Sequence, residues 1–423
     1  MLRRRALALL AAGLSGGAAV WAALGGTSER APIRVGVLHS LTGTMAISER
    51  AVADATLLGV DAINAAGGLL GGRTIVPVVA DGASVPDIFA REAERLILRD
   101  KVSVIFGCWT SASRRTTLPV LEQQNHLLFY PVGYEGLEMS PAVIHTGAAP
   151  NQQILPAVKW AMDHLGTSFF LVGSDEVYAR TAAAIIMDQV AALGGVVVGE
   201  EYAPLGDTDF RTIVRRVVGT QPAVILNMVE GDSNIAFFSA LRAAGVGAAT
   251  MPTLSFALTE NEIQAMDRSL VAGDYIALNY FQSIDNPENR RFVQQFQARF
   301  GANRAVGDPM QAAFSGVHLW AQAVEQAGTE AVRAVRDTVK NQSYAAPGGV
   351  IYVDPETQHC WKAVRIGRIR PNGQVDVMWN SDKPVRPVPY PTHRTRDDWD
   401  QLIARMQSGW GGRWSAPDPI RRS

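Results

Sequence analysis

Short apolar runs alternate with segments of helical periodicity along the first part of the chain. Each apolar run ends at glycine or small polar residues, a pattern typical of buried strands followed by turns. The alternation of strand and helix predicts a doubly wound parallel sheet with right-handed crossovers. The predicted strands are residues 33–39, 74–80, 102–106 and 127–130, and the predicted helices are residues 48–65, 87–100 and 114–124.

The same alternation returns after a loop at residues 147–152, without repetition of the sequence itself. It predicts strands at 168–173, 196–202, 223–228, 251–255 and 274–280, between helices at 155–164, 178–193, 210–218 and 233–244. Three more helices follow, and then antiparallel strands in which Asn372-Gly373 is a hairpin signal. These later elements are helices 288–300, 310–327 and 330–340, and strands 349–353, 360–369 and 374–379.

The full pattern predicts an α/β fold with two doubly wound parallel-sheet lobes, a hinge of several crossovers and a C-terminal antiparallel extension. A chain of 423 residues is long enough to bury two such cores. Prolines at residues 384–391 predict an extended tail on the surface. The predicted parts are residues 1–32 as a leader, 33–150 plus 283–345 as the first lobe, 151–282 plus 346–382 as the second lobe, and 383–423 as the tail.

The leader has the pattern of a signal peptide. Arg3, Arg4 and Arg5 precede an apolar run at residues 6–24, and a polar start follows at residue 27. This pattern predicts export to the periplasm, with an uncleaved membrane anchor as the alternative. No cysteine lies in the leader, which excludes a lipid anchor at the processing site.

Charge, cysteine and histidine content narrow the range of partners. Lys+Arg 39 against Asp+Glu 40 leaves a net charge of −1, so no overall field favours nucleic acid or an anionic membrane surface. Cys108 and Cys360 are too few for a disulfide framework, and their apolar surroundings predict two buried free thiols. The seven histidines are scattered without ligand spacing, so we expect no metal and no other cofactor.

The sequence lacks the motifs of nucleotide-binding and hydrolytic enzymes. It has no Walker loop, no dinucleotide glycine pattern after the first strand and no G-x-S-x-G elbow. No candidate nucleophile has a base in a recognisable arrangement. We therefore predict a binding protein rather than an enzyme.

Polar and aromatic side chains gather where the predicted parallel strands end, in both halves of the chain. Because open α/β sheets bind ligands at these ends, two facing lobes would form a hinged cleft for a small, planar, polar molecule. Asp175 and Asp232 each precede a predicted helix and are expected to cap it. The candidate binding residues at the strand ends are Trp109, Thr110, Ser111, Tyr130, Val132, Gly133, Glu176, Tyr178, Glu230 and Ser255.

The chain resembles the periplasmic substrate-binding proteins of urea and short-chain amide ABC transporters, in the branched-chain amino-acid receptor superfamily. The resemblance covers residues 33 to about 399 and rests on long sequence motifs. They include H-S-L-T-G-T-M-A-I-S-E at 39–49, F-G-C-W-T-S-A-S-R at 106–114, L-F-Y-P-V-G-Y-E-G at 128–136, G-A-A-P-N-Q-Q at 147–153, G-D-S-N at 231–234, N-Y-F-Q-S-I-D at 279–285 and D-P-E-T-Q-H-C-W-K-A-V-R-I-G at 354–367.

This resemblance implies a periplasmic receptor that captures urea or a short-chain amide and delivers it to ABC permease subunits in the membrane. It implies that Ser111 provides a polar clamp and that Trp109 and Tyr130 form aromatic walls. Val132 and Gly133 would complete the floor, and Tyr178 matches an aromatic residue of the second lobe that closes over the ligand. Trp109 is similar to the urea branch, whereas tyrosine at this position is similar to the amide branch.

Three positions depart from the family pattern. Glu176 replaces an aromatic residue, Ala179 replaces a proline, and Glu230 replaces an asparagine. A carboxylate facing the cleft would favour a ligand with more N–H donors, including a cation such as guanidinium, whereas a solvent-facing or arginine-paired position would not. Two other functions remain open: an exported sensor for short-chain amides or amidines that reports to a regulatory partner, and an amide hydrolase, which the absence of a nucleophile–base pair disfavours.

Overall fold

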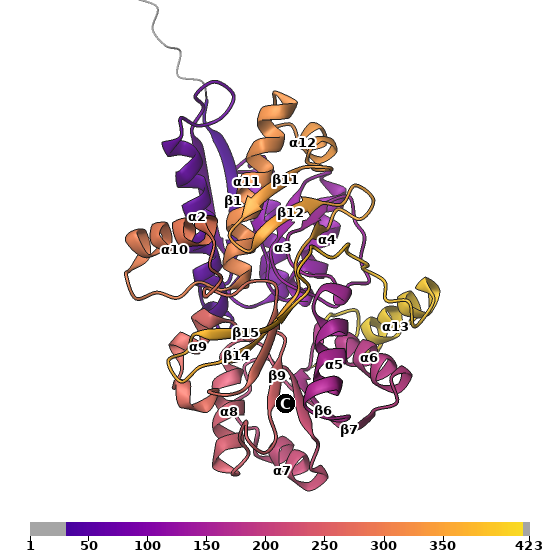
Figure 1. The fold of residues 1–423 in the computed structure, drawn as a ribbon. Coiled ribbons are helices and arrows are strands. Elements are labelled where there is room, and N and C mark those ends of the chain that lie inside the picture. The colour runs from indigo at the N-terminus through magenta and orange to yellow at the C-terminus, as the bar shows by residue number, and fades with distance from the viewer. Residues whose placement is uncertain (1–30, 418–423) are drawn as a thin grey trace, which may run out of the picture.

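The computed structural model describes residues 31–417 and contains two parallel sheets, one in each lobe (Figure 1). The first sheet has the strand order β2-β1-β3-β4-β5, and all of its pairings are parallel. Its strands are β1 (Ile33–His39), β2 (Ile75–Asp81), β3 (Ile105–Gly107), β4 (Leu128–Tyr130) and β5 (Val143–His145). Its sequence-adjacent helices are α2 (Ala46–Ala65), α3 (Pro86–Leu98) and α4 (Ser111–Gln123).

The second sheet has the order β15-β14-β10-β9-β8-β6-β7. Five strands run parallel, and the last two add an antiparallel hairpin at one edge. The strands are β6 (Ser168–Ser174), β7 (Val196–Ala203), β8 (Val224–Met228), β9 (Thr253–Ser255), β10 (Tyr275–Leu278), β14 (Arg365–Ile369) and β15 (Val375–Asn380). The helices and 3₁₀ turns of this part are η1 (Pro150–Gln152), α5 (Ile154–His164), α6 (Val177–Ala192), α7 (Arg211–Thr220), α8 (Ser233–Ala243), α9 (Glu260–Ala265) and η2 (Arg268–Leu270).

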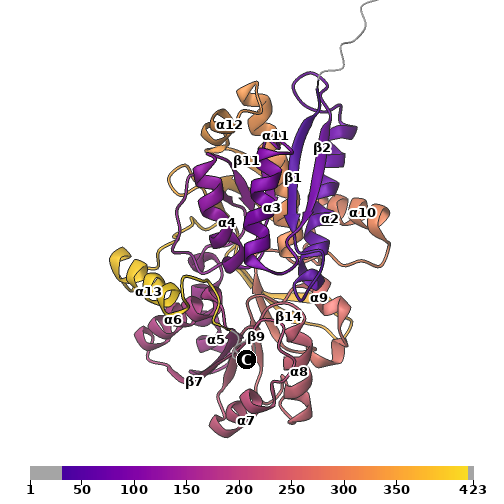
Figure 2. The same cartoon turned by 180° about the vertical axis from the view of Figure 1, so that it is seen from behind.

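The chain returns to the first lobe after β10 and crosses back to the second sheet only at β14. The returning helices pack in the same cores as β1 and β3, and a small antiparallel sheet follows them. Figure 1 and Figure 2 show α11, in this late part of the chain, beside β1. These elements are α10 (Pro287–Phe300), α11 (Asp308–Ala327), α12 (Val332–Val339), β11 (Ser343–Ala346), β12 (Gly349–Val353) and β13 (Cys360–Trp361).

The predicted fold class is confirmed, whereas several details of the prediction are wrong. Residues 346–361 were expected in the second lobe, but Ile351, Val353 and Cys360 are buried with β1 in the first. Residues 360–369 were expected as one strand, but they form β13 and β14, which belong to different sheets. The sequence analysis also missed β5, a strand of three residues whose apolar run is too short to stand out.

The expected extended tail contains a helix, α13 (Arg396–Gly409), which lies beside α6 in Figure 1. Its start is stabilised by Thr395 and Asp398, whose side chains each accept a hydrogen bond from the other's backbone N–H, at 3.2 Å in both cases. The helix is held by Trp399, which is fully buried and donates its indole N–H to the Pro391 carbonyl at 2.8 Å. The sequence analysis predicted an extended tail from the prolines and did not use this capping signal.

Two further expectations concern the cysteines and the leader. Cys108 and Cys360 are both free and buried, as predicted. The predicted signal peptide falls almost wholly on residues 1–30, which lie outside the described part of the chain. No helix within residues 31–417 combines the length and apolar character needed to span a bilayer.

Candidate functional site

The turn between β3 and α4 is tighter than the sequence suggested. Gly107 cannot carry a side chain, because a Cβ there would lie 2.0 Å from the Leu38 carbonyl oxygen. The next residue, Cys108, has a φ of 62°, and Thr110 then caps the helix by accepting the Ser113 N–H at 3.0 Å. Helix α4 therefore begins at Ser111 and not at residue 114, and its first turn faces the space between the lobes.

The Ser111 hydroxyl, predicted as a ligand contact, is already engaged within the first lobe. It donates to Glu135 at 2.5 Å and accepts from Arg114 at 3.1 Å. Arg114 in turn pairs with Glu138 at 3.0 Å, and Arg115 pairs with Glu135 at 3.3 Å. Both guanidinium groups are thus neutralised by partners of their own lobe.

The two lobes touch through the loop after β1 and the first turn of α2. Thr44 donates to Asp232, Ser48 donates to Glu262, and the Asp232 N–H donates to the Thr44 carbonyl at 3.2 Å. Asp232 was expected to cap α8, but its side chain makes no capping bond there and contacts the first lobe instead. Asp175, the other expected cap, pairs with Arg180 at 2.8 Å. The structure thus describes a closed form of the molecule.

A small enclosed cavity lies between the closed lobes, and we call it the interlobe cavity. About 10 Å³ remains free in it, close to what a single water molecule needs. Only Thr110 and Glu176 of the predicted site residues line it. The complete lining is Ser40, Met45, Glu49, Ser84, Pro86, Phe89, Thr110, Ser113, Glu176 and Leu205.

The sequence analysis missed most of the first-lobe lining, although a signal for it existed. Ser40 directly follows β1 and Ser84 follows β2, so both obey the rule that ligands meet the carboxyl ends of parallel strands. Glu49 was hidden in a helix, where it accepts the Ser40 N–H at 2.8 Å and contacts His39 at 3.1 Å. His39 is therefore a structural partner of Glu49.

The predicted aromatic residues are buried where the lobes meet. Tyr130 donates its hydroxyl to the Trp109 carbonyl at 2.5 Å, which fixes the two residues relative to each other. Trp109 is 2% exposed, and its buried indole N–H has no hydrogen-bond partner among the described residues. Tyr178 is buried on the second lobe, and the pKa of its hydroxyl is raised well above its usual value, first by burial and then by Glu230. The electrostatic influence of Glu230 extends to Tyr130 as well.

Glu176 and Glu230 are both buried at this interface, each with 3% of its surface exposed. In residues 31–417, Oε2 of each carboxyl has no hydrogen-bond partner. Burial raises the pKa of Glu176 to about 8, with smaller contributions from Asp175 and Glu135. Burial also raises the pKa of Glu230 well above its usual range, and Glu176 is the next contributor. The arginine-paired arrangement considered for them is not what the structure shows.

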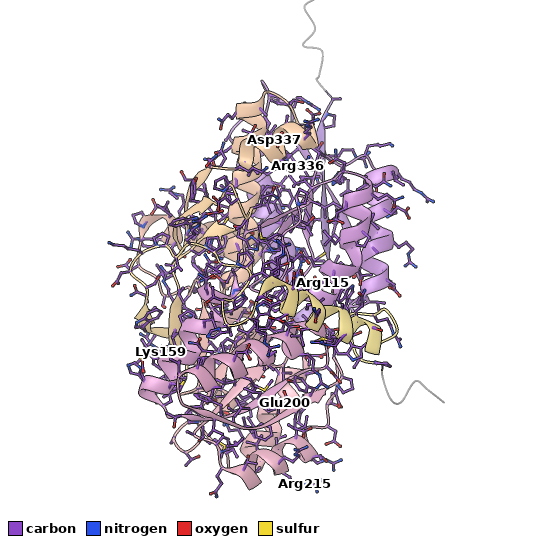
Figure 3. All side chains as sticks on the ribbon, turned by 90° about the vertical axis from the view of Figure 1, so that its right-hand side faces the viewer. Arg115, Lys159, Glu200, Arg215, Arg336 and Asp337 are labelled. Atoms are coloured by element: carbon purple, nitrogen blue, oxygen red, sulfur yellow. The ribbon has the colours of Figure 1, made fainter. Side chains whose placement is uncertain are left out.

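The C-terminal segment holds Glu176 in place. The backbone on either side of it is bonded to this segment: the Val177 N–H donates to the Trp414 carbonyl, and the Ala416 N–H donates to the Asp175 carbonyl, both at 2.9 Å. The Trp414 ring lies 5.1 Å from the guanidinium carbon of Arg115 in the first lobe. Figure 3 shows Arg115 beside helix α13, at the level where the two lobes meet.

The remaining predicted residues lie away from the interlobe cavity. A Cβ on Gly133 would approach the side-chain oxygen of Gln153 to 2.6 Å, which places Gly133 and its neighbour Val132 at the crossover between lobes. Ser255 is buried, and its hydroxyl accepts from Asn227 at 3.0 Å. The described residues contain no group of His, Cys, Asp and Glu that could hold a metal ion.

Relatives of known sequence match the chain at moderate to low identity. The "Leu/Ile/Val-binding protein homolog 6" of Brucella melitensis biotype 1 is 24% identical over 340 residues, which cover 77% of this chain and 85% of that protein. The "Limonene hydroxylase" of Geobacillus stearothermophilus is 30% identical over 147 residues. That second match covers 33% of this chain and only 27% of the limonene hydroxylase.

Solved structures confirm the fold. A solute-binding protein of an ABC transporter from R. palustris, in complex with 4-hydroxybenzoate, has a TM-score of 0.76 at 24% identity, over 84% of this chain and 98% of that one. A leucine-binding protein from Thermotoga maritima has a TM-score of 0.73 at 20% identity, over 82% of this chain and 98% of that one.

The periplasmic binding protein domain family matches residues 33–396. This match confirms the superfamily that the sequence resembled, while the urea and amide branch remains a prediction. Since the match spans most of the described chain, the protein belongs to the periplasmic binding protein domain family and is a solute-binding protein, not an enzyme.

Proposed function

We propose that this protein captures a small planar solute carrying NH₂ groups and delivers it to the permease subunits of an ABC transporter. Urea, short-chain amides and amidines belong to this class. The observation that carries the proposal is the pair of buried carboxyl oxygens on Glu176 and Glu230, to which no group in the described part of the chain donates a hydrogen bond. Buried acceptors without partners are costly, so a ligand rich in N–H groups would stabilise the closed lobes.

The size of the interlobe cavity supports a ligand of only a few heavy atoms. With about 10 Å³ free, the closed lobes leave much less room than the roughly 300–1,000 Å³ typical of drug-sized ligands. A urea-sized solute would need only small side-chain shifts, whereas an aromatic acid would force the lobes apart. Trp109 and Tyr178 do not line this cavity, but both are buried where the lobes meet, and aromatic surface of this kind suits a planar solute.

The charges of the site also disfavour anionic ligands. A carboxylate ligand needs a cation or free donors, but Arg114 and Arg115 are already paired with Glu138 and Glu135. Glu176 and Glu230 supply no positive charge, and each would repel such a ligand when ionised. The benzoate-type and leucine-type ligands of the structural relatives are therefore unsuited to this site.

We infer that the protein acts in the periplasm, where such receptors meet their transporter. The leader pattern supports export, and either a cleaved or a retained leader is compatible with delivery of solute to a membrane permease.

Calorimetric titration with urea, acetamide, acetamidinium, guanidinium, leucine and 4-hydroxybenzoate tests the proposed function. We expect saturable binding by at least one of the four nitrogen-rich solutes and none by the other two. Bound ligand at 100 times its Kd should also stabilise the protein by about 2.7 kcal/mol in thermal melts. Binding of leucine or 4-hydroxybenzoate, with no response to the nitrogen-rich solutes, would overturn the proposal.

A further inference from the structure

Two buried carboxyl groups at the lobe interface lack the positively charged partner that buried carboxylates normally have. Glu176 and Glu230 are almost completely buried, and neither forms an ion pair within the described chain. An ionised carboxylate in this position is strongly disfavoured unless a cation accompanies it. Either the carboxyls stay protonated, or something that enters the closed cleft brings the positive charge.

The surroundings of these two carboxyls are acidic. The groups that act on them electrostatically are Asp175, Glu135, Glu49 and Glu262, and the phenols of Tyr130 and Tyr178 lie within the same influence. All of these groups are neutral or negative. No neighbouring side chain in this group supplies a compensating positive charge.

The cations nearest to the site have partners of their own. Arg114 contacts Glu138, Arg115 contacts Glu135, and Arg180 contacts Asp175 at 2.8 Å. A swing of any of these arginines toward Glu176 or Glu230 would only expose another buried acid. The site as a whole therefore has more acidic groups than basic ones. A change of arginine rotamer would move an unpaired acid to another position without removing it.

We propose that the solute is a small planar cation of the amidinium or guanidinium class, which places its N–H groups on Oε2 of Glu176 and Oε2 of Glu230. This inference rests on the proposed function and selects one ligand class within it. The planar cation has N–H donors for the two orphan oxygens and a single positive charge, which compensates one ionised carboxyl while the other carboxyl of the pair keeps its proton. Hydrogen bonds between charged groups are roughly twice as strong as neutral ones.

A neutral amide fits this site less well. Urea would offer N–H donors but no positive charge. Both carboxyls would therefore have to stay protonated when urea binds. A protonated carboxyl then competes as a donor with the N–H groups of the ligand. Aromatic rings close to the site add to the preference, because the face of an indole or phenol attracts a cation more than a neutral solute.

Matched pairs of cation and neutral isostere test the proposal in the unmodified protein. Guanidinium is compared with urea, and acetamidinium with acetamide, by calorimetry at constant ionic strength and about pH 7.5. We expect each cation to bind on the order of 100-fold more tightly than its neutral partner, since two charge-assisted contacts replace neutral ones. Titration in buffers of different ionisation enthalpy should show release of protons from the protein when the cation binds.

Two substitutions test whether the preference for a cation comes from Glu176 and Glu230. Glu176→Gln and Glu230→Gln keep the size of the side chain and remove its charge, and each should weaken guanidinium binding by a factor of about 10 or more. Glu200→Gln, on an exposed residue of strand β7 in the same lobe, is the control and should leave binding unchanged (Figure 3). Far-ultraviolet circular dichroism and a melting curve establish that each variant is folded.

The outcomes separate the two proposals. If urea or acetamide binds as tightly as the matching cation, or if both glutamine variants bind guanidinium normally, the cation proposal is wrong while the proposed function stands. If neither the cations nor the neutral solutes bind the unmodified protein, the proposed function itself fails. Because the comparison of isosteres needs no variant, a misfolded variant would not prevent the test.

Discussion

Raising the pH should separate the two lobes when no ligand is bound. In the closed structure the Glu176 carboxyl is buried beside the interlobe cavity, and burial raises its pKa from 4.5 to about 8. The negative charges of Asp175 and Glu135 act in the same direction. A closed protein that holds this proton becomes less stable, relative to an open one, when the proton is removed.

The sign and size follow from proton linkage. A hydrated carboxyl releases its proton near pH 4.5, so the closed form has its full stability below that pH and loses it as the pH rises toward about 8. At about 1.36 kcal/mol for each pH unit, the loss approaches roughly 5 kcal/mol. The interlobe bonds from Thr44 to Asp232 and from Ser48 to Glu262 contribute about 1.5–3 kcal/mol each. The two quantities are comparable, so we expect ionisation to shift the ligand-free protein toward the open form.

Small-angle X-ray scattering of the ligand-free protein measures this opening. We expect a larger radius of gyration at about pH 9 than at about pH 5.5. The difference should be smaller for Glu176→Gln but should not vanish, because burial also raises the pKa of Glu230 in the closed form. The exposed-site variant Glu200→Gln should follow the unmodified protein. A radius of gyration that stays constant between these pH values in the unmodified protein would refute the reasoning.

Two further predictions concern stability and thiol chemistry. Trp399→Ala should lower the free energy of unfolding by about 3–5 kcal/mol, because a fully buried indole and its hydrogen bond are removed. Trp379→Ala, at a side chain that is 36% exposed, should cost much less, and equal losses in denaturant titrations would contradict the packing assigned to α13. Cys108 and Cys360 should not react with a soluble disulfide reagent in the native protein, because burial raises both thiol pKa values to about 12. Both thiols should react after denaturation, and rapid labelling of the folded protein would show that one of them is accessible.

Local pattern was sufficient for most elements of the two sheets. Strand β1 was predicted with its observed bounds, and α6 was displaced by only one residue, because an apolar run between turn residues is a property of neighbouring positions. Helix α13 was missed although Thr395 and Asp398 form a capping pair. The prolines at residues 384–391 indicate extended chain only up to the start of this helix and not beyond it.

The candidate site was predicted only in part. Positions at strand ends, such as Thr110 and Glu176, could be identified because parallel strands present their carboxyl ends to a common edge. Whether a side chain at such an end is free could not be predicted. The hydroxyls of Ser111 and Ser255 are used by Glu135 and Asn227, which lie 24 and 28 residues away in the sequence.

The sequence by itself determined two α/β halves, the alternation of most strands and helices along the chain, and the presence of polar and aromatic residues where those strands end. These are consequences of periodicity and turn chemistry, which depend on near neighbours. The tertiary structure alone decided that β11–β13 pack with the first lobe, and that Arg114 and Arg115 are consumed by acids of that lobe. It also decided that Glu176 and Glu230 are left buried without a cation, because ion pairing depends on which distant segments meet when the lobes close.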